Sequence, residues 1–260
     1  MRGVWHRDTV SWIIVSAMLP VVVAASLDLG FAIMQRFGVA LAVISFWQGV
    51  FLFTRAQPLS PIALVTAFAV AVLASGTTEM WQIVLAASFG TVMGEQIFGG
   101  WGRNVVHAGV VTLAFSYFAF PEVLHTGTGP LVAVAAGFGA LLLLVMGVLS
   151  WRIAVAATMG LVLATFALGQ DPAAPFLEGS LVFGLVFLIG DPVASASTRV
   201  GRWAYGALAG ALVAIFGWAD TGIDAPQAVV FATLLASLFA PLLDAAAIAV
   251  ATRKWRGGHA

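Results

Sequence analysis

The chain has 260 residues, of which 62% are hydrophobic and only 8% are charged. A soluble globular domain carries about 25% charged residues, so this composition excludes a soluble fold and predicts an integral membrane protein. Eleven basic and eleven acidic residues balance one another, which argues against a nucleic-acid partner because phosphate binding needs a basic surface. Since the chain lacks cysteine, it cannot supply disulfides, thiolate metal sites or cysteine-ligated iron–sulfur clusters.

Ten apolar segments follow one another along the chain, and a membrane-spanning helix needs roughly 20 residues including its flanks. They cover residues 10–27, 37–54, 60–76, 80–94, 104–121, 130–150, 153–169, 179–190, 203–218 and 227–251. Segments 80–94 and 179–190 are short. Because only brief stretches separate the segments, we predict one all-α membrane domain over residues 1–260, with ten transmembrane helices.

The basic residues fix the orientation of this predicted bundle. With ten spans, both termini and every second connection lie on one side of the membrane. Only Arg36 then falls on the other side. The basic residues on the first side are Arg2, Arg7, Arg55, Arg103, Arg152, Arg199, Arg202, Arg253, Lys254 and Arg256. Since cytoplasmic loops carry the excess of lysine and arginine, we predict that both termini are cytoplasmic in a multi-pass protein of a bacterial inner membrane.

Two of the cytoplasmic connections share a pattern. FGTVMGEQIFGGWGRN (residues 89–104) and FGLVFLIGDPVASASTRVGRW (residues 183–203) each run from Phe-Gly through a Gly-acid pair, Glu95 or Asp191, to Gly-Arg. Paired short, glycine-interrupted segments in a membrane protein point to a central binding site, because irregular backbone is tolerated at depth only where it is buried or lines a cavity. We therefore expect one broken-helix elbow used twice, with Asn104 and Ser197 or Thr198 near the next helix N-termini. The alternative is two ordinary loops, with glycines for turns and arginines for topology.

These residues, in order along nearly the whole chain, resemble one family. The first helix RDTVSWIIVSAMLPVVVAASLDLG, the elbow FGGWGRN, then SWRIAVAATMG, GDPVASASTRVGRWAYG and LLASLFAPLLDAAAIAV are similar to the family that contains the B subunit of the sodium-translocating NADH:quinone oxidoreductase (Nqr) and the D subunit of the Rnf complex. The resemblance implies a ten-helix, urea-transporter-like fold that carries flavin in an electron-transfer complex coupled to ion movement. It implies a non-covalent riboflavin near the cytoplasmic side and an FMN esterified to a threonine on the outer side.

The residues that would hold the non-covalent flavin carry over in part. The family pattern matches Phe98, Gly99, Gly100, Gly102, Arg103 and Asn104, and its aspartate matches Asp191. His107 replaces a family asparagine, and Ala194 replaces a serine. The chain has only EVLHTGTGP where the family has its flavinylation segment, and the glycines around Thr126 and Thr128 do not reproduce the acceptor motif. We therefore expect non-covalent riboflavin or FMN and no covalent FMN.

Two further residues are candidates on physical grounds. Asp244 lies inside the last apolar segment, where a carboxylate is expensive and marks a proton or cation path, or else a residue satisfied by a partner near the cytoplasmic edge. Trp101 lies within the glycine elbow, where its ring can stack on a flavin or pack on a neighbouring helix. No catalytic triad, metal-ligand spacing or phosphate loop is recognisable, so the sequence assigns no catalytic residue, no metal site and no NADH site.

The resemblance favours a membrane subunit that binds a flavin between the elbows and relays electrons within an Nqr/Rnf-like complex, whose other membrane subunits carry flavin or iron–sulfur centres. Quinone is a further candidate partner, although the sequence specifies neither the electron donor nor the acceptor. Such a subunit is not catalytic alone. Gly99, Gly100, Trp101, Gly102, Asn104, His107 and Asp191 would contact the cofactor. The alternatives are a cofactor-free small-solute channel or transporter on the same scaffold, which the missing FMN segment favours, and a structural anchor for redox partners.

Overall fold

The structure is a computed structural model. It describes residues 6–57, 59–74, 77–121, 127–218 and 225–257, with side chains described as far as Thr252. Every regular element in these ranges is a helix. The helices are α1 (Arg7–Leu29), α2 (Ala32–Arg55), α3 (Ile62–Leu73), α4 (Met80–Gly94), α5 (Ala108–Ala119), α6 (Pro130–Val145), α7 (Trp151–Ala167), α8 (Gly179–Phe183), α9 (Arg199–Trp218) and α10 (Ala225–Gly257), with 3₁₀ turns η1 (Gln96–Phe98) and η2 (Ala174–Leu177) and a π-helix η3 (Gly184–Ile189).

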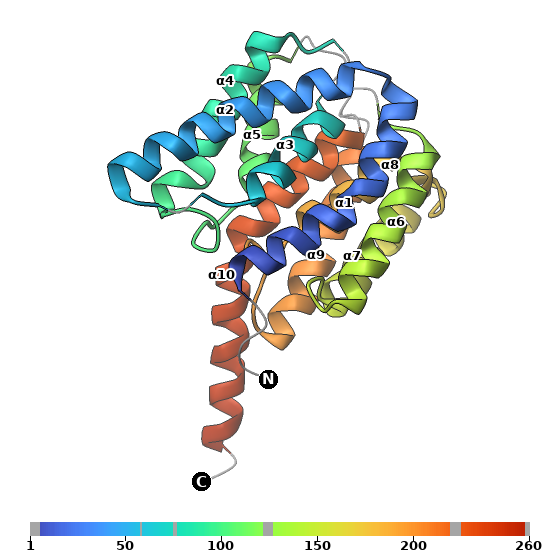
Figure 1. The fold of residues 1–260 in the computed structure, drawn as a ribbon. Coiled ribbons are helices and arrows are strands. Elements are labelled where there is room, and N and C mark those ends of the chain that lie inside the picture. Colours follow the sequence, from blue (N-terminus) through green and yellow to red (C-terminus); the bar gives the residue numbers. More distant parts are fainter. Residues whose placement is uncertain (1–5, 58, 75–76, 122–126, 219–224, 258–260) are drawn as a thin grey trace.

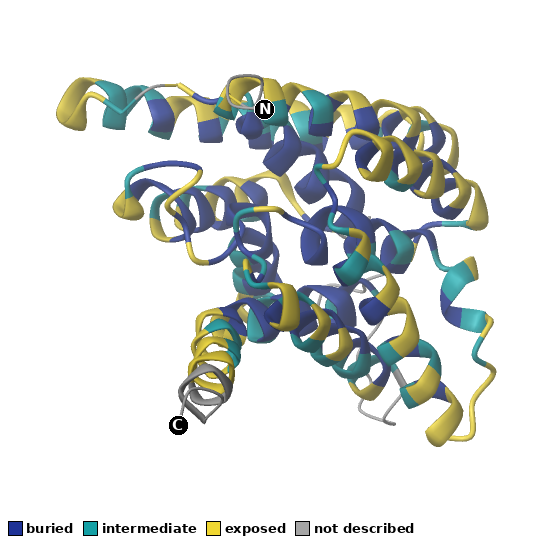
Figure 2. Cartoon of the chain, turned by 90° about the horizontal axis from the view of Figure 1, so that it is seen from below, coloured by how far each residue is buried: buried dark blue, intermediate teal, exposed yellow. Residues whose placement is uncertain are grey.

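The ten predicted segments correspond one by one to these ten helices, and the composition explains why they associate in a bilayer. Four helices contain stretches long and apolar enough to cross a membrane alone: Arg7–Leu29, Ala32–Arg55, Arg199–Gly217 and Ala225–Thr252. The others are shorter apolar helices. Large apolar side chains cover the outside of the bundle, as at Phe53, Phe118 and Val145, which are 90%, 84% and 78% exposed, while the dark buried residues of Figure 2 lie between the helices. Such a surface is suited to lipid and not to water.

The helices form two halves of five in which most of the contacting helix pairs correspond. In the first half α1 contacts α3, α2 contacts α4, and α5 contacts both α3 and α4. In the second half α6 contacts α8, α7 contacts α9, and α10 contacts both α8 and α9. The halves are joined by α1 against α6 and by α5 against α10. In the predicted ten-span topology five is an odd number of spans, so the second half would cross the membrane in the opposite sense, as in an inverted repeat.

This repeat corrects the expectation of one elbow used twice. The first elbow joins α4 to α5, and its counterpart in the second half is the connection from α9 to α10. The second elbow joins η3 to α9, and its counterpart is the connection from α3 to α4. The true partner of the short, broken α8–η3 segment is therefore α3, which has only 12 residues. The two elbows meet as neighbours at one end of the bundle and are not symmetry equivalents.

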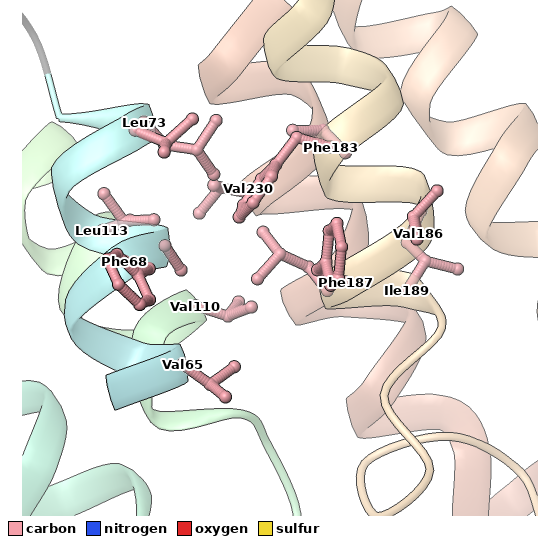
Figure 3. Close-up of a cluster of buried hydrophobic side chains, with 14 of the residues drawn as sticks. Val65, Phe68, Leu73, Val110, Leu113, Phe183, Val186, Phe187, Ile189 and Val230 are labelled. Atoms are coloured by element: carbon pink, nitrogen blue, oxygen red, sulfur yellow. The ribbon is translucent and has the colours of Figure 1, made fainter. Parts of the chain in front are cut away.

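The core lies where the two halves meet. Figure 3 shows Phe68 and Leu73 of α3 and Leu113 of α5 facing Phe183 and Phe187 of the α8–η3 segment. All but one of the twelve residues of α3 are buried, as expected for a helix that is apolar all round and enclosed by neighbours. The broken α8–η3 segment is thus held on its inner side by well-packed side chains, which fixes where the chain leaves it.

The second half is held by direct backbone contact between α7 and α9. Gly206 and Gly210 form a GxxxG pair on α9 and face Ala157 on α7, while Gly160 of α7 faces Ala207 of α9. A Cβ atom at Gly206 would lie 2.7 Å from the carbonyl oxygen of Ile153, and one at Gly210 would strike the carbonyl oxygen of Ala157. Small residues let helices approach this closely in lipid, where packing replaces the hydrophobic effect.

Candidate functional site

Glycine makes the backbone of the first elbow possible. After α4 ends, the η1 turn leads into Gly99, Gly100 and Gly102, with φ angles of +101°, +87° and +97°. L-residues rarely adopt this left-handed region, whereas glycine does so without strain. The turn is closed by Gly100 N, which donates to Glu95 O at 3.1 Å, and by Gly99 N, which donates to Gln96 O at 3.2 Å. The elbow therefore folds back on itself directly after Glu95.

Two of the predicted site residues organise the rest of the elbow. Asn104 is buried, and its Oδ1 accepts from Gly102 N at 3.1 Å while its Nδ2 donates to Val106 O at 2.9 Å. Asn104 therefore holds the loop together, and α5 begins four residues later, at Ala108. His107 is the N-cap of α5, and its Nδ1 accepts from Gly109 N at 3.1 Å. This bond leaves Nε2 as the imidazole nitrogen that carries the proton in the neutral ring.

Trp101 and Gln57 supply unsatisfied polar atoms beside this loop. Trp101 is 3% exposed, and its Nε1 is buried without a hydrogen-bond partner. Gln57 donates from Nε2 to Gln96 O at 3.1 Å, while its Oε1 is buried without a partner. Buried polar atoms normally have partners, so the donor of Trp101 and the acceptor of Gln57 are available to a ligand at the elbow. Arg103 is exposed and lies outside this buried set.

The second elbow begins where the helix breaks. The chain passes from α8 into the π-helix Gly184–Ile189, a form found mostly at functional sites. Asp191 follows, 4% exposed, and its Oδ2 accepts from Ala194 N at 2.8 Å. Tyr205 of α9 donates to Ile189 O at 3.3 Å. The carboxyl group of Asp191 is thereby fixed in the interior.

The two elbows bring three ionisable groups together: Glu95, His107 and Asp191 interact electrostatically, and each is buried. Burial raises the pKa of the Glu95 carboxyl to about 7; the charge of Arg7 acts in the opposite direction. Burial also lowers the pKa of His107 and raises that of Asp191, while the attraction between the two groups opposes both shifts. All three lie in the connections between helices. Burial thus favours the uncharged forms of these three side chains, which can donate and accept hydrogen bonds.

Asp244 has a different environment from the one expected of a residue on an open ion path. Its Oδ2 accepts from Ser197 N and Oγ, both at 2.8 Å, and its Oδ1 accepts from Thr198 N at 2.9 Å and Thr198 Oγ1 at 2.6 Å. These residues directly precede α9. Asp244 therefore caps the N-terminus of α9 from α10, which matches the partner-satisfied alternative.

Two threonines, Thr126 and Thr128, belong to the connection between α5 and α6. The described one, Thr128, lies at the opposite end of the bundle from the elbows. Thr126 lies outside the described residues. The carbonyl oxygen of Thr128 accepts from Gly179 N at 2.9 Å, and its Oγ1 is buried without a partner. Nearby, Gly129 N donates to Asp28 Oδ2 at 3.2 Å. Thr128 is thus enclosed by the starts of α6 and α8, far along the chain from either elbow.

The cavities beside Asp191 are small. One of about 10 Å³ is lined by Asp191 and Pro192, with Val65 and Phe187 behind them. It adjoins a second of about 70 Å³, lined in part by the same Pro192. Two larger hollows, of about 330 and 360 Å³, lie on the apolar outer surface, against α9–α10 and α1–α6. Pockets for drug-sized ligands measure roughly 300–1,000 Å³, so the space beside Asp191 is below that range.

Comparison with known proteins places the chain in a family. The family model for NQR2, RnfD and RnfE matches residues 5–130 and 124–252. The chain belongs to this family. It is 26% identical over 263 residues to the B subunit of the Na(+)-translocating NADH-quinone reductase of Ectopseudomonas mendocina, covering 80% of this chain and 65% of that protein. It is also 26% identical over 301 residues to the protein of the same name from Klebsiella pneumoniae, covering 92% and 72%. The chain thus spans about two thirds of the length of these relatives.

The sequence points to Glu95, His107 and Asp191, but it does not reveal the residues that pack beside them. Gln48 lies beside Glu95, and its Oε1 accepts from Ser60 N at 3.4 Å. Gln48 and Gln57 come from the end of α2, and the only available signal was their polarity within or after a long apolar run. Arg7 interacts with Glu95 from the start of α1. These contacts depend on the way α1 and α2 pack against the elbow, which no local pattern reveals.

Proposed function

We propose that this protein is a membrane subunit of a multi-subunit redox complex of the Nqr/Rnf type, in a bacterial inner membrane, and that the meeting point of its two elbows is the cofactor site. The observation that carries the proposal is the burial of Glu95, His107 and Asp191 together, at one end of a bundle whose core is mainly apolar. Family membership and the names of the relatives support a role in electron transfer coupled to ion movement. That resemblance is also the basis for proposing an electron donor, a quinone acceptor and partner subunits.

The donor chemistry of the elbows suits a flavin. An isoalloxazine ring presents carbonyl oxygens and ring nitrogens, which need both hydrogen-bond donors and acceptors. Trp101 Nε1 and His107 Nε2 offer N–H groups, and Gln57 Oε1 and the Asp191 carboxyl offer acceptors. A non-covalent riboflavin or FMN would supply the electron chemistry, whereas these residues would bind it, orient it and exclude water.

The space available sets a condition on this proposal. Since the cavities beside Asp191 measure about 10 and 70 Å³, a three-ring cofactor enters only if the elbow loops move. We infer that the first elbow is the part that moves, because its turn is built around three glycines; the hydrogen bonds by which Asn104 holds the loop together would then have to break. Flavin binding is therefore expected to change the environment of Trp101.

The test is a visible absorbance spectrum of the protein purified from its native membrane, together with any copurifying subunits. A flavin spectrum in this chain that is lost in the double variant His107→Ala, Asp191→Asn supports the proposal. Asp171→Asn is the matched control, because Asp171 is exposed in the connection after α7, away from both elbows. Tryptophan fluorescence, to which nine tryptophans contribute, should be quenched by added riboflavin in the wild type, and less in Trp101→Phe and in the double variant; this gives a second readout.

The small cavities favour a second candidate, a cofactor-free transporter or channel on the same scaffold. A colourless protein that neither binds riboflavin nor shows tryptophan quenching, but that passes a small neutral solute into liposomes, would replace the first proposal by this one. A colourless protein that copurifies with pigmented partners and passes no solute would indicate a structural anchor.

A further inference from the structure

A polar cavity of about 70 Å³ lies between the start of α7 and the second elbow. Its polar side chains are Ser150, Ser195 and Arg202, and Gly147 and Gly190 leave room beside them. One water needs roughly 10–15 Å³ of such space, so the cavity accommodates a group of about five heavy atoms. That is the size of a phosphate group.

Arg202 gives this cavity a positive charge. Its Nε donates to Ala196 O at 3.3 Å, which fixes the plane of the guanidinium group. No carboxylate lines this cavity among the residues that the structure describes. Of the nearest acids, Asp191 lines the smaller adjoining cavity and Asp244 is engaged by Ser197 and Thr198. An arginine in such surroundings favours an anion, and its planar fork fits phosphate oxygens.

Ser150 supplies an independent indication. It is the N-cap of α7, yet its side chain makes no capping hydrogen bond, and its Oγ is buried without a partner. A buried hydroxyl without a partner is unfavourable, so its hydrogen-bonding capacity is available to a ligand in the cavity that it lines. The unpaired N–H groups at the start of the 17-residue α7 also favour negative charge at this point.

We propose that this cavity is an oxyanion site that binds a phosphate group, supplied by the headgroup of an anionic phospholipid or by a soluble phosphate ester. The site lies at the end of the bundle where the basic connections gather, which is the predicted cytoplasmic interface. It adjoins the Asp191 side of the proposed cofactor site, but none of the hydrogen-bonding residues named there lines it. Phosphate binding and flavin binding are therefore measured separately, and the failure of one proposal can be told from the failure of the other.

The experiment uses the full chain purified in a neutral detergent. Inorganic phosphate is titrated by calorimetry, with chloride of equal ionic strength as reference, and phosphatidylglycerol is titrated in native mass spectrometry. Arg202→Gln is expected to weaken binding about ten-fold and Ser150→Ala several-fold. Arg199→Gln is the matched control, because it removes the same charge from the same turn of α9 at an exposed position outside the cavity, and it should change the affinity less than about two-fold.

Each outcome of these titrations supports or overturns the proposed oxyanion site. Binding of phosphate alone identifies a soluble ester as the ligand, and binding of the lipid that phosphate does not displace identifies a headgroup. Equal losses in Arg202→Gln and Arg199→Gln would show general surface attraction and overturn the site, as would the absence of binding in both titrations. Ser150→Ala removes one unpaired atom and preserves the fold, so a loss of affinity in that variant supports the proposal even where Arg202→Gln is unstable.

Discussion

Asp244 is predicted to stabilise the protein as a helix cap. Asp244→Ala removes all four hydrogen bonds to Ser197 and Thr198, so the free energy of unfolding should fall by about 2 kcal/mol. Asp244→Asn keeps an oxygen acceptor and should lose about half as much. Thermal unfolding in detergent measures both. A wild-type melting temperature in Asp244→Ala would mean that the carboxylate is dispensable for the fold and would return it to the ion-path role expected from its place in an apolar helix.

Glu95 should make stability depend on pH. Burial raises its pKa from 4.5 to about 7, so the folded state favours the protonated form. The stabilisation is fully present below pH 4.5 and is lost as the pH rises to about 7. At about 1.4 kcal/mol per pH unit this amounts to at most about 3 kcal/mol. In Glu95→Gln the melting temperature should vary less with pH over this window. An unchanged pH profile in that variant would show that Glu95 is solvated.

For single residues, the sequence indicated which side chains belong to the site more reliably than it indicated the role of each one. The Gly-acid pairs drew attention to Glu95 and Asp191, and the structure places both in the interior. The family resemblance implies a cofactor contact for Asn104, and in the structure its side chain closes its own loop. Local hydrogen bonds of asparagine compete with ligand contacts, and which of the two prevails depends on loop dihedral angles that sequence does not specify.

The elbow glycines can be tested against a glycine in a helix. Gly102 has a φ of +97° and its nearest prospective Cβ contact is Arg7 Cδ at 3.7 Å, so Gly102→Ala introduces backbone strain without a clash. We expect a loss of about 1–2 kcal/mol. Gly137 lies in α6 with open space around it, and Gly137→Ala should instead gain up to about 1 kcal/mol. Unfolding of both variants measures the contrast, and equal effects would refute the left-handed turn.

The contact between α7 and α9 should tolerate no added methyl group. Gly210→Ala forces a Cβ atom against backbone atoms of Ala157 and Leu161, which cannot rotate away. We expect a loss of about 3 kcal/mol or failure to fold. Gly49→Ala is the control, since nothing lies within 4 Å of that position on α2. Expression yield and melting temperature decide; a stable Gly210→Ala would mean that the two helices lie farther apart.

The helices themselves were predictable, and the break in one of them was not. Apolar length alone located all ten, because lipid leaves few alternatives to a helix. The π-helix Gly184–Ile189 has no signature beyond a short apolar run. The likeness of the two Phe-Gly segments misled, because shared letters suggested equivalence, whereas the contacts show that α8 corresponds to α3.

The bundle as a whole has a predicted orientation that can be measured in cells. The chain has no cysteine, so single cysteines report without background. Arg152→Cys at the start of α7 should react with a membrane-impermeant maleimide only after permeabilisation. Asp171→Cys beyond the end of α7 should react in intact cells. The opposite pattern would invert the topology and place the elbows outside.

The arrangement of two halves was beyond the sequence alone. The positive-inside count predicts an even number of spans, but the inverted repeat rests on which helices touch, such as α2 with α4 and α7 with α9. Within a repeat the side chains have diverged, so Val65 of α3 and Phe187 of η3 line one small cavity from corresponding helices without a shared local pattern. Packing geometry is retained where residue identity is not.

The last helix has a practical consequence. α10 has 33 residues and so measures about 50 Å, well beyond the roughly 30 Å of bilayer hydrocarbon. Beyond Asp244 it continues for about 20 Å and extends past the ends of the other helices, as Figure 1 shows. An affinity tag or fluorescent reporter fused to the carboxyl end is therefore carried away from both loops that enclose Asp191, which makes this end the natural handle for purification and imaging.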